Sequence, residues 1–218
     1  APRALDVPGK GRVLILAYGA ASSGVPADWA AGPMTPGVNL LPDTVEELVE
    51  ETKARLAPIR RGGDLVVVSV HLGGNWGYRI EPEERRMAHA LIDHSDVDIV
   101  FGHSSHHPRG VEVHRGKLIL YGCGDLINDY EGIGGHESFR SDLVLAYILD
   151  VSSESGALRS LTMLPYRLRA FRLQRAEAPE AAWLANTMDR ECRGFGGRVT
   201  MTGDQELSLT WGGANFAS

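Results

Sequence analysis

Asp64-Leu-Val-Val-Val-Ser-Val-His71 is a short run rich in β-branched residues that ends in a histidine. Runs of this kind are typical of strands that are covered on both faces, as in a parallel sheet. Arg12-Val-Leu-Ile-Leu-Ala-Tyr18 has the same character. Between the two runs, Thr44 and Glu47 have the spacing of a helix capping box, and apolar residues follow at helical spacing. The order strand, helix, strand predicts parallel βαβ units with right-handed crossovers.

The rest of the chain extends this pattern and then changes it. A second helix is predicted to begin at Pro82, and a third buried strand to span Val97–Phe101. Residues 1–11 are expected to form a leader, and residues 19–43 a long loop of the kind that often borders a site. Beyond residue 110 the β-rich segments are joined by tight turns, which predicts antiparallel hairpins. The expected elements there are strands at 111–115, 117–121, 143–149, 158–164 and 167–174, a helix at 179–193, and a hairpin at 198–202 and 207–211.

The composition excludes several classes of protein. The 218 residues are 43% hydrophobic and 23% charged, which is ordinary for a folded chain and unlike a disordered, collagen-like or coiled-coil protein. A net charge of -6 argues against nucleic acid or an anionic membrane as partners, because both attract a dominant positive field. No apolar run approaches the roughly 20 residues of a membrane helix. With Cys123 and Cys192 as its only cysteines, the chain suits a reducing compartment, and we expect it to be cytoplasmic.

Histidines gather in one part of the sequence. All eight lie between residues 71 and 136. His71 and His103 each come just after a predicted parallel strand, where open α/β sheets place their ligands, and His106 lies on the following loop. Neutral imidazole is the commonest side-chain ligand for ions such as zinc, iron and nickel. The pattern predicts that these three histidines hold divalent metal ions, with hydrogen-bonded loop histidines as the alternative.

The other histidines are interpreted differently. His89 and His94 lie on or just after the helix that begins at Pro82, and surface solvation accounts for both. His114 alternates with valines on a hairpin strand, which predicts a side chain that faces solvent. His136 lies in a glycine-rich loop and has no expected partner. We do not expect these residues to be metal ligands.

Oxygen-bearing, cationic and aromatic side chains also lie near the predicted strand ends. Asp125, Asn128 and Asp129 follow a strand end, although such groups also serve to cap turns. Arg109 has a side chain able to clamp a carboxylate or a phosphate, the alternative being a surface role. The loop Trp76–Tyr78 offers an aromatic wall that suits a peptide better than a bare phosphate.

Three segments together resemble one protein family. They are Asp64-Leu-Val-Val-Val-Ser-Val-His-Leu-Gly-Gly-Asn75, Gly102-His-Ser-Ser-His-His-Pro-Arg-Gly-Val-Glu-Val113 and Lys117-Leu-Ile-Leu-Tyr-Gly-Cys-Gly-Asp-Leu126. They resemble the CapA-type proteins named for poly-gamma-glutamate capsule synthesis, which share the calcineurin-like metallophosphoesterase fold. The resemblance covers residues 12–175. It implies an α/β fold, a two-sheet sandwich of βαβ units followed by antiparallel hairpins, with a dinuclear centre of divalent metal ions at the strand ends.

The resemblance also implies how the chain is divided. Residues 1–175 would be the C-terminal part of the metallophosphoesterase-like domain, and residues 176–218 a helix and hairpin packed on it. The Gly-Asp and Asn-Asn-His motifs of the family's first half have no counterpart in residues 1–70. We therefore expect a missing N-terminal half or a partner segment to complete the centre. The ligand-bearing segments of the family match His71, His103 and His106.

The function implied is that of a metal-dependent enzyme, acting as a hydrolase on a peptide or polyglutamate-like chain. The side chains expected to be catalytic are His103, His107, Asp125 and Arg109. Those expected to bind the substrate are Asn75, Trp76, Tyr78 and Asn128.

Two alternatives remain open. In the first, metal or Arg109 polarises a backbone carbonyl of a ribosomal peptide while a histidine or an aspartate removes the α-proton, because some CapA-like proteins resemble peptide epimerases. In the second, the fold has lost part of its metal set and the chain is a non-catalytic binding or scaffold protein. The absent first-half motifs favour the second alternative, and Asn75 stands where many relatives carry glutamate.

Overall fold

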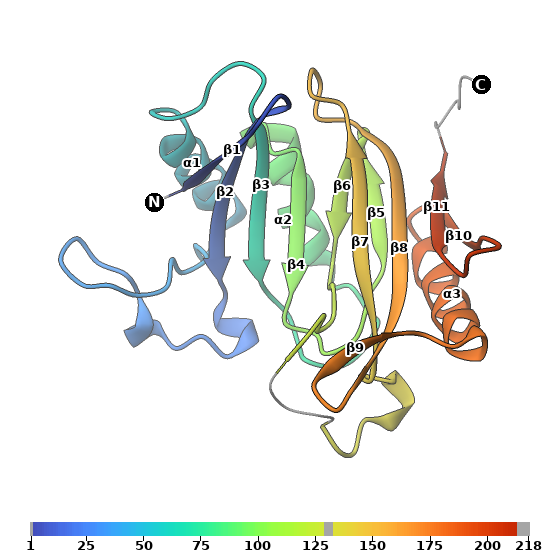
Figure 1. The fold of residues 1–218 in the computed structure, drawn as a ribbon. Helices are drawn as coiled ribbons and strands as arrows, with labels where there is room; N and C mark the ends of the chain where they lie inside the picture. The colour runs from blue at the N-terminus through green and yellow to red at the C-terminus, as the bar shows by residue number, and fades with distance from the viewer. Residues whose placement is uncertain (1, 129–132, 213–218) are drawn as a thin grey trace.

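The first sheet is built on the two apolar runs of the N-terminal half. The computed structural model describes residues 2–128 and 133–212 and places six strands in the order β1-β2-β3-β4-β6-β5 (Figure 1). Strands β2, β3, β4 and β6 are parallel, whereas the edge strands β1 and β5 run antiparallel to their neighbours. The strands span Arg3–Val7 (β1), Gly11–Gly19 (β2), Leu65–His71 (β3), Ile99–His103 (β4), Val111–His114 (β5) and Lys117–Leu120 (β6).

The second sheet is antiparallel and packs against the first. Its order is β10-β11-β8-β7, and β9 pairs with β8. Leu143 and Leu161 of this sheet share a buried core with Ile99 and Leu118 of the first sheet. The strands span Leu143–Val151 (β7), Leu158–Arg169 (β8), Arg172–Arg175 (β9), Gly197–Met201 (β10) and Leu207–Trp211 (β11).

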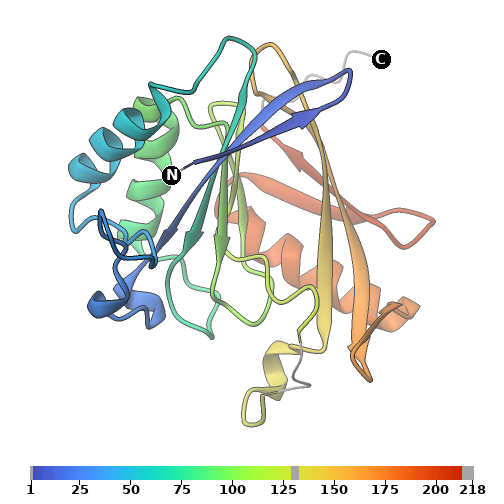
Figure 2. The same ribbon diagram turned by 60° about the vertical axis from the view of Figure 1, so that its left-hand side comes forward.

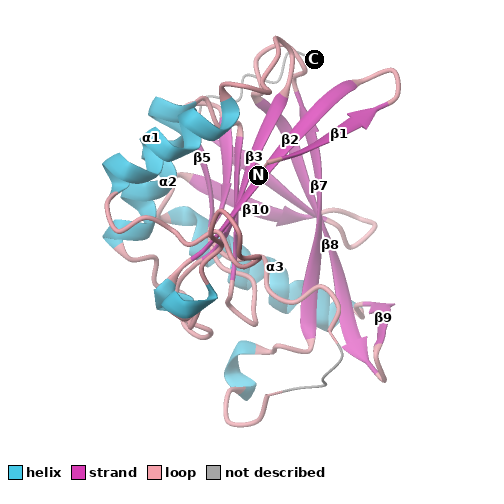
Figure 3. Ribbon diagram, turned by 90° about the vertical axis from the view of Figure 1, so that its left-hand side faces the viewer, coloured by secondary structure: helices cyan, strands magenta, loops and turns pink. Residues whose placement is uncertain are grey.

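Two helices cover the opposite face of the first sheet. α1 (Val45–Leu56) and α2 (Pro82–Ser95) bury Leu48 and Met87 in one cluster with Val68 of β3. Figure 2 shows these helices on one side of the first sheet, and Figure 3 shows them on the side away from β7 and β8. The first sheet is therefore covered on both faces, as its continuous apolar strands predict.

The ends of the helices follow local sequence signals. The predicted capping box begins α1, because the Thr44 hydroxyl accepts a hydrogen bond from the Glu47 N–H at 3.2 Å and the Glu47 carboxylate accepts one from the Thr44 N–H at 3.3 Å. The third helix, α3 (Ala178–Arg193), contributes Leu184 and Met188 to the core between the sheets. The division of the chain at residue 175 stays a prediction.

Strand register brings two histidines to the same edge of the sheet. His71 on β3 pairs with Gly19 on β2 and with His103 on β4. In Figure 1 the arrows of β2, β3 and β4 all point toward this edge. Gly102 permits the close approach of β4 and β6, because a Cβ there would lie 2.6 Å from the carbonyl oxygen of Leu120. The backbone thus fixes the edge that carries the predicted metal ligands.

The predicted α/β sandwich, with βαβ units followed by antiparallel hairpins, is confirmed. The expected leader, however, contains β1, whose five side chains are all exposed and which is held by backbone pairing with β2. β4 begins at Ile99 rather than Val97. The carboxylate of Asp98, just before the strand, accepts a hydrogen bond from the N–H of Val66 at 2.8 Å.

Two further segments refine the expectations. The predicted strand at 167–174 is wrong, because β8 continues to Arg169 and a turn at Ala170 and Phe171, with φ of +51° and +56°, separates it from β9. The loop at 19–43 holds two short 3-10 helices and otherwise lacks regular elements. None of the described helices combines the length and the apolar character needed to cross a membrane.

Candidate functional site

Two imidazoles meet at the carboxyl ends of β3 and β4. The Nδ1 atoms of His71 and His103 lie 3.0 Å apart, and Nε2 of His103 lies 3.0 Å from the hydroxyl oxygen of Ser69. In the hydrogen bond between these two rings, one Nδ1 carries the hydrogen and the other accepts it. Burial of His103, together with the neighbouring His71, lowers the pKa of His103. The lowered pKa favours the neutral imidazole, which is the form that binds metals.

The histidine pair borders a cavity on the inner face of the first sheet. The cavity has a volume of about 610 Å³, and its polar lining consists of Arg3, Asn39, His71 and His103. Apolar walls come from β2 and from the loop at residues 19–43. An anionic ligand in this cavity would face one positively charged group, the guanidinium of Arg3.

A second pair lies on the loops that follow β4 and β6. Nδ1 of His106 lies 2.8 Å from Oδ2 of Asp125, which also accepts a hydrogen bond from Nδ2 of Asn128 at 3.2 Å. Within the part of the chain that the structure describes, the buried Oδ1 of Asn128 has no hydrogen-bond partner. A buried amide oxygen without a donor is costly, and a metal ion or a substrate N–H would satisfy it. Asp129, the third oxygen-bearing residue predicted here, lies outside the described residues.

The backbone between the two pairs is strained at Ser104. Its φ is +134°, a conformation that residues with a Cβ rarely adopt. The Ser104 hydroxyl donates to the carbonyl oxygen of Gly73 at 2.9 Å, and the N–H of His106 donates to the carbonyl oxygen of Asn75 at 3.0 Å. These bonds hold the loop after β4 against the loop after β3, so they fix the position of His106 on that loop.

His107 and Arg109 are buried beneath the same loop. Nε2 of His107 accepts a hydrogen bond from the Gly77 N–H at 3.1 Å, and Nδ1 lies 3.1 Å from the carbonyl oxygen of Pro108. Burial lowers the pKa of His107 to about 4, so the ring is neutral at pH 7. Arg109 pairs with Glu84 at 3.0 Å, and the two side chains are 5% and 9% exposed. These contacts support the loop, and a catalytic role for either residue stays a prediction.

Trp76 lies at the centre of an aromatic cluster beside His106. Its ring stacks on that of His136 with centroids 4.1 Å apart and contacts the ring of His106 at 5.3 Å. Tyr78 meets the ring of His107 edge-on at 4.7 Å. The interpretation of His136 as a residue without a partner is wrong, because its loop folds back onto Trp76. A glycine-rich loop carries no sequence signal for such a contact.

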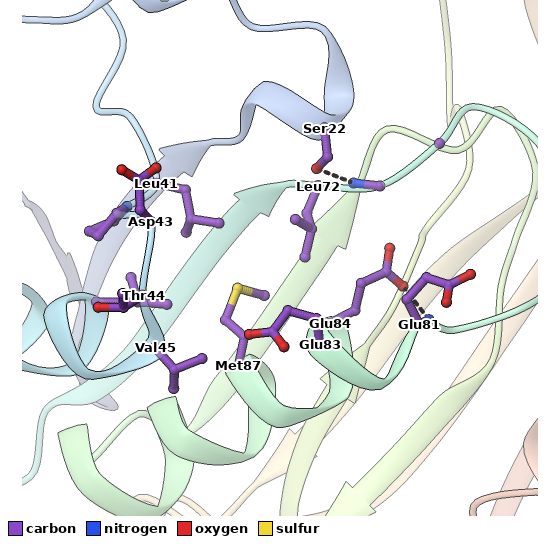
Figure 4. Close-up of a pocket in the computed structure, with 14 residues that line it drawn as sticks. Ser22, Leu41, Asp43, Thr44, Val45, Leu72, Glu81, Glu83, Glu84 and Met87 are labelled. Carbon is purple, nitrogen blue, oxygen red and sulfur yellow. Dashed lines mark hydrogen bonds between the residues drawn. The ribbon is translucent and has the colours of Figure 1, made fainter.

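A separate pocket lies between the sheet and its helices, as Figure 4 shows. It has a volume of about 350 Å³ and apolar walls that include Leu41, Leu72 and Met87. Four carboxylate side chains also line it, namely Asp43, Glu81, Glu83 and Glu84. This acidic lining repels an anionic ligand, so the pocket suits an apolar or cationic group.

One group of three side chains in residues 2–128 and 133–212 has donor atoms close enough to hold a metal ion. It consists of His89 on α2 with Glu112 and His114 on β5. The structure corrects one interpretation and refines another. His114 does not face solvent, because its side chain is 19% exposed and bonds to Asp93 at 2.9 Å. His89 is partly exposed, as expected, but its Nε2 also lies 3.1 Å from Oε1 of Glu112, a partner that solvation does not predict.

The side chains at the strand ends are of the types that bind metal ions, but too few of them lie close together to hold one ion. The imidazoles of His71, His103 and His106 and the oxygens of Asp125 and Asn128 are of the types that transition metals bind. Within the described residues, the buried Oδ1 of Asn128 has no hydrogen-bond partner, as is expected of an oxygen that receives a ligand from outside them. Among the described residues, however, the three histidines and Asp125 do not form a group of three within reach of one ion.

Comparison with known proteins places the chain in a family. Residues 1–130 match the family described as Bacterial capsule synthesis protein PGA_cap. The chain belongs to this family. A "Probable polyglutamine synthesis accessory protein" of Mycobacterium tuberculosis is 49% identical over 199 residues, which cover 91% of this chain and 52% of that relative. The PGA biosynthesis protein CapA of Bacillus subtilis is 31% identical over 101 residues, or 46% of this chain and 25% of that relative. The capsule biosynthesis protein CapA of Bacillus anthracis is 28% identical over 92 residues, or 42% of this chain and 21% of that relative.

Membership confirms the predicted resemblance to CapA-type proteins. The match to the capsule synthesis family ends at residue 130, so it includes the His71–His103 pair and the His106–Asp125 pair and excludes α3. This capsule synthesis family member spans about half the length of its Mycobacterium tuberculosis relative.

Proposed function

We propose that this chain carries part of the active site of a metal-dependent hydrolase that acts on a peptide or polyglutamate-like substrate. The observation that carries the proposal is the pairing of His71 with His103 at the ends of adjacent parallel strands, beside a cavity of about 610 Å³. Open α/β sheets bind their ligands at this edge. The names of the relatives, which refer to polyglutamine synthesis, PGA biosynthesis and capsule biosynthesis, support the substrate class.

The cofactors of this proposal are divalent metal ions. His71, His103 and His106 would supply nitrogen ligands, and the buried amide oxygen of Asn128 would supply an oxygen ligand. When bound at such a site, a divalent ion generates hydroxide near neutral pH and polarises the carbonyl oxygen under attack.

Neighbouring side chains hold these ligands in place. The hydroxyl of Ser69 fixes the ring of His103 through Nε2, and the carboxylate of Asp125 fixes the ring of His106 through Nδ1. A carboxylate on one ring nitrogen sets the tautomer and raises the basicity of the other nitrogen. Asp125 therefore prepares Nε2 of His106 to bind an ion, besides being a candidate for proton transfer.

The single charge that lines the cavity favours an anionic chain. The guanidinium of Arg3 would attract the carboxylates of a polyglutamate-like substrate. The half-buried rings of Trp76 and Tyr78 would contact apolar parts of that chain, and the exposed amide of Asn75 would bond to its backbone. These contacts are the substrate-binding roles that we propose for the loop after β3.

A further segment is proposed to complete the metal centre. The 199 matched residues make up 52% of the Mycobacterium tuberculosis relative, so that protein is roughly 1.8 times as long as this chain. Ala17 on β2 is exposed beside the cavity that contains His71. A segment or a partner protein that covers this part of the sheet would bring additional ligands to the His71–His103 pair and the His106–Asp125 pair.

A non-catalytic binding role is the second candidate. In its favour, the strand-end histidines and Asp125 of the described chain do not form a group of three within reach of one ion. The name of the Mycobacterium tuberculosis relative, an accessory protein, also agrees with a protein that binds the polymer without cleaving it.

The experiment that tests the proposal is incubation of the purified chain, together with the segment proposed to complete the metal centre, with poly-gamma-glutamate and Mn²⁺ or Zn²⁺ in heavy water, followed by size-exclusion chromatography and mass spectrometry. We expect shortened polymer, with the shortening lost in His71→Ala and retained in the exposed control His94→Ala. Deuterium at Cα without shortening would support a peptide epimerase instead. Polymer binding without cleavage, unchanged in His71→Ala, would support the non-catalytic role.

A further inference from the structure

His89 on α2 and His114 on β5 stack against each other. Their ring centroids are 3.8 Å apart, and their planes are 9° from parallel. Oε1 of Glu112 lies 3.1 Å from Nε2 of His89. Strand alternation explains the arrangement, because Glu112 and His114 point toward α2 while Val111 and Val113 join the core between the sheets.

The geometry of these three side chains is close to that of a metal site. The donor atoms of His89, Glu112 and His114 all lie within 4.8 Å of one another. Zinc–nitrogen bonds are about 2.0–2.1 Å long, so two ligands of one ion lie about 3–4 Å apart. The two rings would have to rotate out of their parallel stack for their nitrogen lone pairs to converge with Oε1 of Glu112 on one tetrahedral ion. Two histidines and a carboxylate are a ligand set that suits zinc and related divalent ions.

Outer partners already orient the donors. Oδ1 of Asp93 lies 2.9 Å from Nε2 of His114, and the Tyr121 hydroxyl donates to Oε2 of Glu112 at 2.7 Å. Carboxylates and hydroxyls that bond to metal ligands fix their orientation and raise their affinity for the ion. The bond from Tyr121 also leaves Oε1 as the carboxylate oxygen nearest His89.

An ion can reach these side chains from solvent. His89 and Asp93 line a shallow surface depression of about 730 Å³ on the outer side of α2. The side chain of His89 is 25% exposed, whereas that of Glu112 is 6% exposed. The carboxylate is thus largely shielded from water, while one side of the group stays open to an incoming ion.

We propose that His89, Glu112 and His114 bind a zinc-class divalent cation that ties α2 to the β5–β6 hairpin. This site lies on the face of the first sheet that α2 covers, whereas His71 and His103 border the cavity on the other face. The proposed cation site is therefore separate from the strand-end site and does not depend on the proposed function. Because its ligands come from a helix and a strand that are far apart in sequence, bound metal stabilises their packing.

Arg85 would compete with the ion for the carboxylate of Glu112. Its Nη2 lies 2.8 Å from Oε1 of Glu112, and its side chain is 46% exposed. An ion on Oε1 has to displace the guanidinium, because two cations on one shielded oxygen repel each other. Arg85→Met removes the charge and keeps an apolar side chain beside Phe195, over whose ring the guanidinium carbon now lies at 5.3 Å. This substitution is expected to tighten metal binding.

The test is a titration of the chain with Zn²⁺ and Co²⁺ in a background that carries His71→Ala and His106→Ala. We expect the background protein to bind the ion, with a higher Tm and slower hydrogen exchange in α2 and the β5–β6 hairpin. His89→Ala and His114→Ala should each weaken binding at least about tenfold. The matched control His94→Ala, an exposed histidine on the same helix, should leave the affinity unchanged, and Arg85→Met should raise it.

Two results would overturn the proposal. One is equal affinity in the background protein and in both histidine variants. The other is the absence of binding in the background protein and also in its Arg85→Met variant. If circular dichroism shows that a histidine variant is unfolded, Glu112→Gln replaces it in the titration. This substitution retains the shape of the side chain and should weaken metal binding in the same way. Failure of this site leaves the strand-end proposal unaffected, because the tested protein lacks two of those histidines.

Discussion

His71 and His103 are register partners on β3 and β4, and their Nδ1 atoms lie 3.0 Å apart. Paired residues on neighbouring parallel strands point to the same face of the sheet, so a histidine at each strand end brings the two rings together. The loop after β4 then returns to the loop after β3, where the N–H of His106 donates to the carbonyl oxygen of Asn75 at 3.0 Å. Sheet register and this loop contact together position the candidate site.

Removing either partner of the Arg109–Glu84 ion pair should destabilise the fold. The two side chains meet at 3.0 Å and are nearly fully buried. Arg109→Met or Glu84→Gln leaves a buried charge without its partner, which is expected to cost about 3–5 kcal/mol in the free energy of unfolding. Urea denaturation of the single and double variants measures this coupling. The double variant should lose clearly less than the sum of the single losses, and additive losses would contradict the coupling.

Asp189 on α3 should make stability depend on pH in the acid range. Its carboxylate accepts a hydrogen bond from the N–H of Val199 at 3.0 Å and pairs with Arg193 and Arg198. Burial opposes the charged form, but these partners outweigh burial and lower the pKa of Asp189 to about 2. The unfolded carboxyl has a pKa of about 3.9, so the unfolded chain binds more protons between these values. The stabilisation from Asp189 is therefore fully present above about pH 5 and is lost as the pH falls toward 2.

Asp189→Asn checks this expectation. The variant should be less stable by roughly 1–2 kcal/mol at neutral pH, because two charge-assisted bonds are weakened. The gap to the parent protein should close as the pH falls from 4 to 2, and denaturant titrations across this range follow it. The exposed Asp28→Asn is the matched control. A gap that stays constant down to pH 2 would show that the folded pKa is not lowered.

Gly102→Ala should disrupt the contact between β4 and β6. An added Cβ would lie 2.6 Å from the carbonyl oxygen of Leu120 and 2.7 Å from that of Tyr121. Backbone atoms in a sheet cannot move aside easily, so the expected loss is at least about 1–3 kcal/mol. Gly62→Ala is the control, because a Cβ there meets no atom within 4 Å. Thermal unfolding should separate the two variants, and equal Tm values would contradict the prediction.

Local signals predicted most of the fold and the core of the candidate site. The capping box of Thr44 and Glu47 and the valine-rich run that ends at His71 depend on neighbours in sequence, so their structures could be predicted from sequence alone. The pairing of His71 with His103 was also predictable, because the carboxyl ends of parallel strands meet at one edge.

Contacts set by packing could not be predicted in this way. Residues 3–7 have no buried face, and their strand exists because β2 offers an edge to pair with. The alternation of His114 with valines shows that its side chain points away from the core between the sheets. It does not show that α2 lies on that side, because hydrophobic periodicity describes single elements and not how two elements pack. The burial of Arg109 against Glu84 could not be predicted either, because it also depends on how two elements pack.

Arg3→Gln should weaken the binding of a polyglutamate-like chain. Arg3 lines the same cavity as His71 and His103, and loss of its charge reduces the attraction for carboxylates. The Kd should rise several-fold at low salt, and the difference should shrink at high salt because ions screen the interaction. Fluorescence polarisation with labelled poly-gamma-glutamate measures both effects, with the exposed Lys10→Gln as control. An unchanged Kd at low salt would exclude Arg3 from the binding site.

The most direct test of the strand-end metal centre is a Co²⁺ titration of the chain that carries His89→Ala and His114→Ala, with and without His71→Ala. The substitutions at His89 and His114 remove the proposed cation site between α2 and β5, so any remaining Co²⁺ binding is assigned to the strand ends. The protein with His71 intact is predicted to bind Co²⁺ with nitrogen-ligand absorption bands, and His71→Ala to weaken that binding at least about tenfold. Equal Co²⁺ affinity with and without His71, or no binding in either protein, would contradict a metal centre at this edge of the sheet.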